Sequence, residues 1–337
     1  MSAICAATSD EQKIGSSVLT AGRLLQLAAV PIFIVLAVAL ALPACADEPL
    51  FGFIYATDLL PQNKWEAEQW VTLREGRSQG DFTALQTRTE LSYGVTSYFQ
   101  LSGYVNFAYA SAYHNSPSGE TVPPEIFADY PMKDPNALFS QFRFESVSLE
   151  AIVRVLSPYT DPFGLAFYVE PSVGPRTFEL ENRVILQKNF FNDQLVVAFN
   201  ATLGFEWRLL PGDKTLDPTE PDFKNHWDQE TDVNFGLGVS YRFIPNWSLG
   251  VEFQNEREWA GLNPFNSSKA TNVAWYLGPT LHYGGQRFFA TLTALFQLPM
   301  AQDWANKWPD SLVVRGITNA DDFENFRIRL KVGFFFN

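Results

Sequence analysis

Apolar and polar residues alternate along most of the chain after residue 64. Between residues 85 and 95, for example, apolar residues and threonines occupy every second position, and Gln86, Arg88, Glu90 and Ser92 stand between them. A period of two puts these two sets of side chains on opposite faces of a β-strand, whereas helical residues share a face every three or four positions. The chain is therefore predicted to consist of strands that have one apolar and one polar face.

Twelve runs of this kind follow one another. Each is near or above the length of about ten residues that a tilted strand needs to cross a bilayer. The predicted strands are 65–75, 82–95, 98–110, 140–156, 163–173, 177–188, 194–208, 229–244, 247–258, 272–283, 288–298 and 323–336. In the fourth run the alternation loses its phase, because Phe142 and Phe144 lie on one face and Val147 and Leu149 on the other. We therefore expect a β-bulge near Glu145, where one extra residue would restore the phase.

The connections between these runs alternate in length. Every second connection is a tight turn: 94–97, 157–162, 189–193, 244–246 and 284–287. All the long connections fall in the other set, which comprises 76–81, 111–139, 174–176, 209–228, 259–271 and 299–322. Outer-membrane barrels have this asymmetry, with short periplasmic turns and longer outer loops, and closure leaves no backbone group unpaired in the bilayer. The fold class is therefore predicted to be all-β, a closed antiparallel transmembrane β-barrel of about twelve strands.

The first 46 residues have a different character. Residues 24–42 are apolar, follow Arg23 and precede Ala44-Cys45-Ala46, which predicts a signal peptide that is cleaved after Ala46. Two alternatives stay open: an uncleaved anchor helix, and a lipoprotein that is lipidated on Cys45. Residues 47–64 would form an N-terminal periplasmic segment, either a short extra strand or a stretch tucked into the periplasmic mouth. The barrel would then span residues 65–337.

Charge and cysteine content narrow the function classes. Cys5 and Cys45 are the only cysteines and precede the expected cleavage point, so disulfides, thiolate catalysis and cysteine metal sites are excluded from the mature chain. The net charge of -13 makes nucleic acid an unexpected partner, because phosphate binding favours basic surfaces. The sequence has no phosphate-binding loop, dinucleotide fingerprint or metal motif, and we expect no cofactor and no metal.

The alternation also predicts which side chains face the lumen. Rows such as Phe235, Leu237 and Val239 should face lipid, and the residues between them should face inward. The charged residues predicted to line the lumen are Glu66, Glu68, Arg74, Arg88, Glu90, Glu179, Glu181, Arg183, Glu206, Arg242, Glu252, Glu256, Arg327, Arg329 and Lys331.

Closure of the barrel would bring the last strand beside the first. We expect this to set Arg327, Arg329 and Lys331 against Glu66 and Glu68 near the periplasmic end. Two interpretations stay open for the charged rows. They either neutralise one another and fill the lumen, or form a charge-segregated constriction that selects ions or polar solutes.

Catalysis is not expected. The only histidines are His114, His226 and His282, and a hydrolase in the barrel wall would need a histidine and a serine held together. His282 faces the lumen by its phase, but no serine stands out as its partner. The protein is therefore predicted not to be an enzyme.

Three stretches resemble known sequences. Residues 57–68 and 88–96 are similar to uncharacterised Gram-negative outer-membrane barrels, including putative transporters of the phenol meta-cleavage pathway group. The C-terminal strand, ending Phe334-Phe335-Phe336-Asn337, resembles the assembly signal of such barrels, although Asn337 follows the final phenylalanine. The resemblance implies location in the bacterial cell outer membrane. The partners it implies are the lipid bilayer, lipopolysaccharide, the barrel assembly machinery and a small-molecule solute.

The predicted function is a channel or transporter that passes small polar or aromatic solutes by diffusion through a charged lumen. A non-conducting structural or interaction barrel is the second hypothesis, and a barrel-borne lipid hydrolase is the third.

Overall fold

The computed structural model describes residues 49–336, except residues 78, 131, 133, 213, 215, 221–222, 301, 304–312, 315–316 and 319–322. The described residues belong to one compact unit. The predicted signal peptide and its cleavage point lie outside the described residues.

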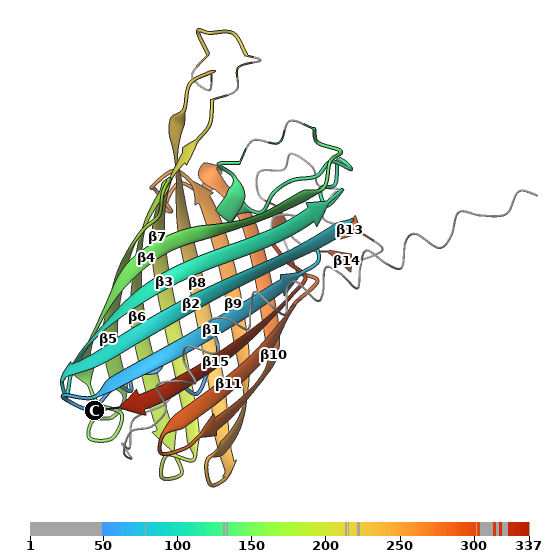
Figure 1. Ribbon diagram of the computed structural model, residues 1–337. Helices are drawn as coiled ribbons and strands as arrows, with labels where there is room; N and C mark the ends of the chain where they lie inside the picture. Colours follow the sequence, from blue (N-terminus) through green and yellow to red (C-terminus); the bar gives the residue numbers. More distant parts are fainter. Residues whose placement is uncertain are drawn as a thin grey trace, which may run out of the picture. The chain divides into compact units, whose positions relative to one another are not determined.

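The fold is a closed antiparallel β-barrel of twelve long strands, as the alternation predicted (Figure 1). The strands are β1 (Trp65–Glu75), β2 (Asp81–Thr96), β3 (Phe99–Tyr113), β4 (Phe139–Leu156), β5 (Gly164–Val173), β6 (Thr177–Phe190), β7 (Leu195–Leu210), β8 (His226–Ile244), β9 (Trp247–Ala260), β10 (Ala270–Gly284), β11 (Phe288–Gln297) and β15 (Phe326–Phe336). Consecutive long strands pair with each other, and β15 closes the barrel by pairing with both β11 and β1.

The remaining elements are short. Strand β12 (Gln302–Asp303) pairs with β10, and β13 (Val313–Val314) pairs with β14 (Ile317–Thr318). Two single-turn 3-10 helices, η1 (Glu125–Phe127) and η3 (Ser267–Lys269), lie in connections. Among the described residues, no helix has the length and apolar character needed to cross a membrane.

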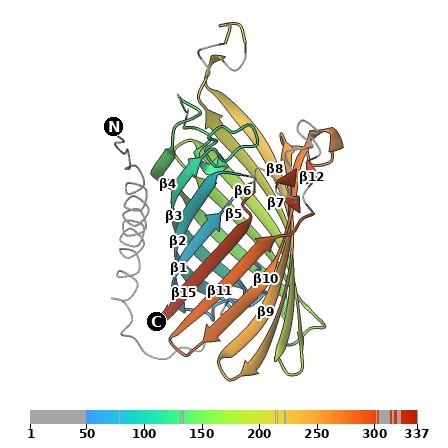
Figure 2. The same ribbon diagram turned by 90° about the vertical axis from the view of Figure 1, so that its right-hand side faces the viewer.

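All the long connections lie at one end of the barrel (Figure 2). The turn end carries the connections 97–98, 157–163, 191–194, 245–246 and 285–287. The loop end carries the connections 76–80, 114–138, 174–176, 211–225, 261–269 and 298–325. Strand β1 starts and β15 ends at the turn end, so the predicted asymmetry of the connections is confirmed.

The predicted bulge in β4 is also confirmed. The register of β3 with β4 shifts by one residue beside the pair Phe107–Phe144, which leaves Glu145 without a partner in the ladder. Apolar side chains on both sides of the bulge, such as Phe144 and Val147, therefore face outward. One extra residue keeps the whole outer face of a long strand apolar.

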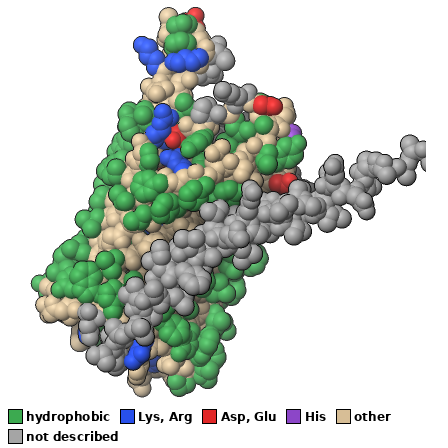
Figure 3. Space-filling model, in the orientation of Figure 1, with side chains coloured by type: hydrophobic (Ala, Val, Ile, Leu, Met, Phe, Trp, Pro, Cys, Tyr) green, Lys and Arg blue, Asp and Glu red, His purple; other side chains and the backbone are tan. Residues whose placement is uncertain are grey.

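Large apolar side chains cover the outer wall, as Figure 3 shows for one side of the barrel. On β8, Phe235, Leu237 and Val239 are each more than a third exposed, which places them on the outer face. Buried apolar clusters lie inside instead. In one of them, Phe51 and Ile54 of the N-terminal segment pack against the inner wall of β7.

Candidate functional site: the charged lumen

Five cavities lie along the lumen, and each shares lining residues with a neighbour. The outer cavity, about 250 Å³, lies at the loop end beside Glu125 and Phe323. The middle cavity, about 180 Å³, shares Arg74 and Arg327 with the outer cavity. A side cavity of about 220 Å³ adjoins the middle cavity at Arg329. The lumen is therefore partly open above the N-terminal segment.

Below the middle cavity the lumen narrows. The narrow cavity, about 70 Å³, shares Tyr55 and Trp70 with the middle cavity. The turn-end cavity, about 430 Å³, shares Asp58 with the narrow cavity and opens among the short turns. The tightest part of the lumen therefore coincides with the N-terminal segment.

Residues 49–64 form this N-terminal segment, which follows the inner wall near the turn end. Its backbone N–H groups donate to side chains of the wall. The pairs are Gly52 N to Glu252 Oε1 (2.7 Å), Phe53 N to Glu252 Oε2 (2.8 Å), Tyr55 N to Asn200 Oδ1 (2.7 Å), Thr57 N to Gln187 Oε1 (2.6 Å) and Leu60 N to Gln100 Oε1 (2.8 Å). Because these acceptors lie on β9, β7, β6 and β3, the segment crosses from one side of the barrel to the other.

Glycines in the wall make room for the N-terminal segment. A Cβ atom on Gly236 would lie 2.3 Å from Ile54 Cδ1, and one on Gly238 would lie 2.7 Å from Phe51 Cε1. Farther along the segment, Asp58 accepts a hydrogen bond from Gln187 Nε2 at 2.9 Å. Burial raises the pKa of Asp58, although the hydrogen bond from Gln187 opposes the rise.

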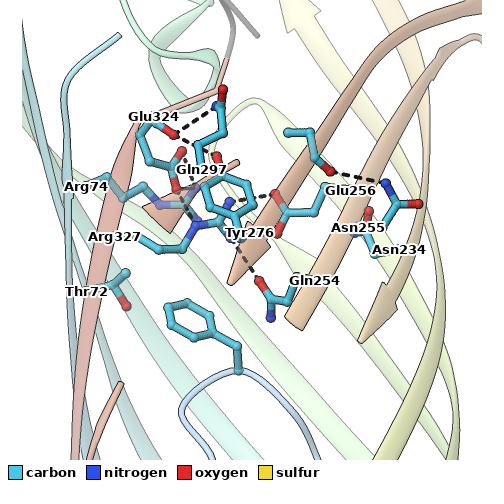
Figure 4. Close-up of polar contacts among 12 residues, drawn as sticks. Thr72, Arg74, Asn234, Gln254, Asn255, Glu256, Tyr276, Gln297, Glu324 and Arg327 are labelled. Atoms are coloured by element: carbon cyan, nitrogen blue, oxygen red, sulfur yellow. Dashed lines mark hydrogen bonds and ion pairs between the residues drawn. The ribbon is translucent and has the colours of Figure 1, made fainter. Parts of the chain in front are cut away.

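Arg327 organises the boundary between the middle and outer cavities (Figure 4). Its Nη1 and Nη2 groups donate to the two carboxylate oxygens of Glu256 at 2.6 and 2.7 Å, and its Nε lies 2.6 Å from Glu324 Oε1. The guanidinium carbon stands 3.7 Å from the centre of the Tyr276 ring. Arg74 Nη1 also reaches Glu324, at 3.2 Å.

Glu324 lies just before β15 and belongs to no strand. Burial by itself would raise the pKa of Glu324, but Arg327 and Arg74 outweigh burial and hold the pKa at about 2. The carboxylate therefore stays ionised across the physiological range, and the cluster keeps its charges.

Other charged pairs line the same wall. Arg183 Nη2 lies 2.7 Å from Glu181 Oε1, and Arg88 pairs with Glu170. Near the loop end, Arg208 Nη2 lies 2.7 Å from Glu125 Oε1, in the long connection before β4, and 2.6 Å from Glu206 Oε1. Burial would raise the pKa of Glu125, but Arg208 outweighs burial and lowers the pKa.

One acidic group in the described residues has the geometry for a cation. Carboxylate oxygens of Glu125, Glu230 and Glu258 lie within 4.8 Å of one another. Arg208 already supplies positive charge to Glu125. The group therefore does not define a metal site by itself.

Comparison with known proteins gives the family. The sequence matches the family of unknown function DUF6662 over residues 43–336. The chain belongs to this family. No curated protein matches the sequence.

Solved structures show the fold that the barrel shares. The COG4313 outer membrane channel from Pseudomonas putida F1 is 11% identical, with a TM-score of 0.50, and the match covers 83% of this chain and 98% of that chain. The NanC porin is also 11% identical, with a TM-score of 0.43 and coverage of 80% and 98%. The translocator domain of the autotransporter NalP from Neisseria meningitidis is 10% identical, with a TM-score of 0.45 and coverage of 80% and 87%. These likenesses concern the fold alone.

Most of the predicted charged residues contact one of these cavities. Arg74, Arg88, Glu181, Arg183, Glu256, Arg327 and Arg329 line the middle cavity. Glu66, Glu68, Glu90 and Lys331 line the narrow cavity. Glu179 lines the side cavity, and Arg242 is exposed beside the turn-end cavity. The other two are held by contacts within the protein: Glu206 pairs with Arg208, and Glu252 accepts hydrogen bonds from the N-terminal segment and from Thr293.

The expected contact of Arg327 and Arg329 with Glu66 and Glu68 is wrong. In the register of β1 with β15, Arg329 stands opposite Thr72, four residues from Glu68, or about 13 Å along the strand. Arg327 lies still farther toward the loop end. Closure does bring the two strands together, but the charges occupy different heights in the lumen.

Of the three cations on β15, only Lys331 lies near Glu66 and Glu68. It stands opposite Trp70, and its Nζ lies 3.8 Å from the centre of the Trp70 ring. It shares the narrow cavity with Glu66, Glu68 and Glu90. The cross-strand charge match therefore holds only for the last cation of β15.

The sequence prediction missed two kinds of residue. Uncharged acceptors such as Gln187 and Asn200 hold the N-terminal segment, and only their inward phase marked them. Glu125 comes from a connection, where alternation gives no information about direction. Glu324 fell within the predicted strand 323–336, but β15 begins only at Phe326, so the alternation does not extend to Glu324. His282 Nδ1 lies 2.8 Å from Thr291 Oγ1, whose hydroxyl donates to the Pro49 carbonyl at the start of the segment.

Proposed function

We propose that the protein is an outer-membrane channel that passes small polar or aromatic solutes through its charged lumen. The observation that carries the proposal is the succession of cavities with shared lining residues, from the loop end to the turn end, inside a closed barrel. A wall with polar side chains inside and apolar side chains outside suits a water-filled path through a bilayer. The resemblance to putative transporters of the phenol meta-cleavage pathway group supports aromatic solutes in particular.

In this proposal the loop end faces outward and the turn end faces the periplasm. The signal peptide would direct the chain across the inner membrane. Lipopolysaccharide would surround the loop end, and the barrel assembly machinery would engage β15. The N-terminal segment would set the narrowest point of the path, because the 70 Å³ cavity lies beside it.

Planar-bilayer recording of the purified, detergent-folded protein tests the proposal. The measurements are unitary conductance and the reversal potential under a salt gradient. Arg88 lines the middle cavity, so Arg88→Gln should shift the reversal potential toward cation selectivity. Lys188→Gln is the matched control, because Lys188 is exposed on β6 and contacts the Pro162 carbonyl. Equal reversal potentials for the wild-type and Arg88→Gln proteins would contradict a path through the lumen.

A non-conducting barrel is the alternative. The observation that favours it is the density of ion pairs at the boundary of the middle cavity, where Arg327, Glu256 and Glu324 lie in contact. A silent bilayer from protein that is shown to be folded would support this alternative. The outer membrane channel of the same fold supports transport rather than catalysis, and a lipid hydrolase is the third hypothesis.

A further inference from the structure

Five arginines and two glutamates line the middle cavity. Four of these arginines contact a carboxylate. Arg74 contacts Glu324, Arg88 contacts Glu170, Arg183 contacts Glu181, and Arg327 contacts Glu256 and Glu324. Arg329 is the exception, because it forms no ion pair with any residue in the described part of the chain. The cavity therefore contains one arginine without a counterion among those residues.

The contacts of Arg329 hold its guanidinium in place but do not use all of its N–H donors. Its Nε donates to Thr72 Oγ1 at 2.8 Å, and its Nη1 donates to the Gly52 carbonyl at 3.2 Å. Its guanidinium carbon lies 4.0 Å from the centre of the Phe53 ring. The Nη2 group has no acceptor among the residues that the structure describes. Arg329 borders both the middle and the side cavity, so this amino group belongs to a side chain at the lumen surface.

The nearest strands add positive charge. In the register of β1 with β15, Thr72 stands opposite Arg329 and Arg74 stands opposite Arg327. Positions two residues apart on a strand share a face, so Arg329 and Arg327 lie on the inner face about 7 Å apart along β15. On β2, Arg88 stands opposite Trp70 and lines both cavities with Arg329. A half-buried guanidinium among other guanidiniums is costly unless an anion joins it.

We propose that the middle cavity binds a small organic monocarboxylate through Arg329, with Arg74 and Arg88 adding to the attraction. A carboxylate accepts two parallel hydrogen bonds from a guanidinium, which suits donors that are fixed in place. Glu181 in the same cavity and Glu170 in the side cavity repel a second negative charge. A volume of about 180 Å³, with Tyr55 and Tyr168 in its wall, limits the body of the solute to about the size of one ring. This inference rests on the proposed channel function and names its solute class.

The test is isothermal titration calorimetry on the full, detergent-folded protein with benzoate, and with benzamide as its neutral isostere. We expect benzoate to bind at least about tenfold more tightly, because hydrogen bonds to a charged group are stronger than neutral ones. Arg329→Gln should weaken benzoate binding by about tenfold or more and leave benzamide unchanged. Arg287→Gln is the matched control, since Arg287 is exposed in the turn 285–287. It should leave both affinities unchanged.

Three outcomes would overturn the inference: equal affinities for benzoate and benzamide, an equal loss in both variants, and displacement of benzoate by an equal concentration of inorganic phosphate. The comparison of benzoate with benzamide uses the wild-type protein alone. It can therefore refute the inference even if Arg329→Gln does not fold. Binding is measured without a membrane, which separates the two proposals. Benzoate binding with a silent bilayer would contradict only the channel. Conduction without discrimination between the probes would contradict only the site.

Discussion

At the scale of single residues, the lumen depends on charged side chains that meet from distant parts of the chain. Arg327 contacts Glu256, which lies on β9, and Glu324, which lies outside the strands. Alternation predicted that Arg327 and Glu256 face inward. It could not predict that they meet, because the partner of a side chain depends on strand register and on loops that carry no periodic signal. The same reason explains why Arg329 was expected beside Glu68 and lies beside Thr72 instead.

The buried carboxylate of Glu324 should stabilise the folded barrel in a pH-dependent way. Because its pKa falls from the ordinary 4.5 to about 2 on folding, its contribution is fully present above about pH 4.5 and is lost as the pH falls toward 2. At pH 7 we expect Glu324→Gln to lower the free energy of unfolding by about 3 kcal/mol, at roughly 1.4 kcal/mol per unit of pKa. At pH 2 the difference should shrink to less than about 1 kcal/mol.

Denaturant unfolding of the detergent-folded protein at both pH values measures this difference. Glu220→Gln, at an exposed position of the connection 211–225, is the control and should change the free energy of unfolding little at either pH. A loss for Glu324→Gln that is as large at pH 2 as at pH 7 would show that packing, and not charge, is responsible.

At the scale of elements, local sequence predicted some features well. The bulge at Glu145 could be located because a change of phase in an alternating strand has one simple structural cause. The conformation of the N-terminal segment was harder to predict. The alternation of Phe51, Phe53 and Tyr55 suited a strand, but the N–H groups of Gly52, Phe53 and Tyr55 bond to wall side chains, so the segment adds no strand to the sheet.

Deletion of Glu145 should be tolerated. Without it, Phe144, Ser146 and Val147 would continue the out–in–out alternation, and the ladder with β3 would run without a shift. We expect the free energy of unfolding to change by no more than about 1 kcal/mol. Deletion of Leu149 is the contrasting variant, because it would turn Glu150 toward lipid. Heat-modifiable migration on gels reports folding, and similar behaviour of the two deletions would refute this account of the bulge.

The glycines of β8 should control the N-terminal segment. In Gly238→Val, the new side chain would occupy the place of the Phe51 ring, at a cost of about 1–3 kcal/mol unless the segment moves away. We therefore expect a larger unitary conductance in planar bilayers. Gly103→Val is the control, because a Cβ atom on Gly103 meets nothing within 4 Å. An unchanged conductance of folded Gly238→Val would mean that the segment does not limit the path.

At the scale of the whole molecule, the sequence predicted the closed barrel and the sorting of its connections, because both follow from strand length, strand number and loop parity. It did not predict how the lumen is filled. Alternation shows whether a side chain faces the lumen or the lipid. The size of a cavity depends instead on where, along the barrel axis, the inward side chains of the twelve strands meet. The connection before β4 shows this, since Phe127 packs there against Ala108 and Ala110 of the inner wall.

Substituted-cysteine conductance tests most directly the claim that solutes pass through the lumen. The described residues contain no cysteine, so a single thiol can be placed inside or outside the barrel. Asn234 lines both the middle and the outer cavity, and Leu237, on the same strand, faces outward. We predict that a charged thiol reagent reduces the unitary current through Asn234→Cys and leaves Leu237→Cys unchanged. Currents that respond equally in the two variants, or in neither, would contradict a conducting lumen.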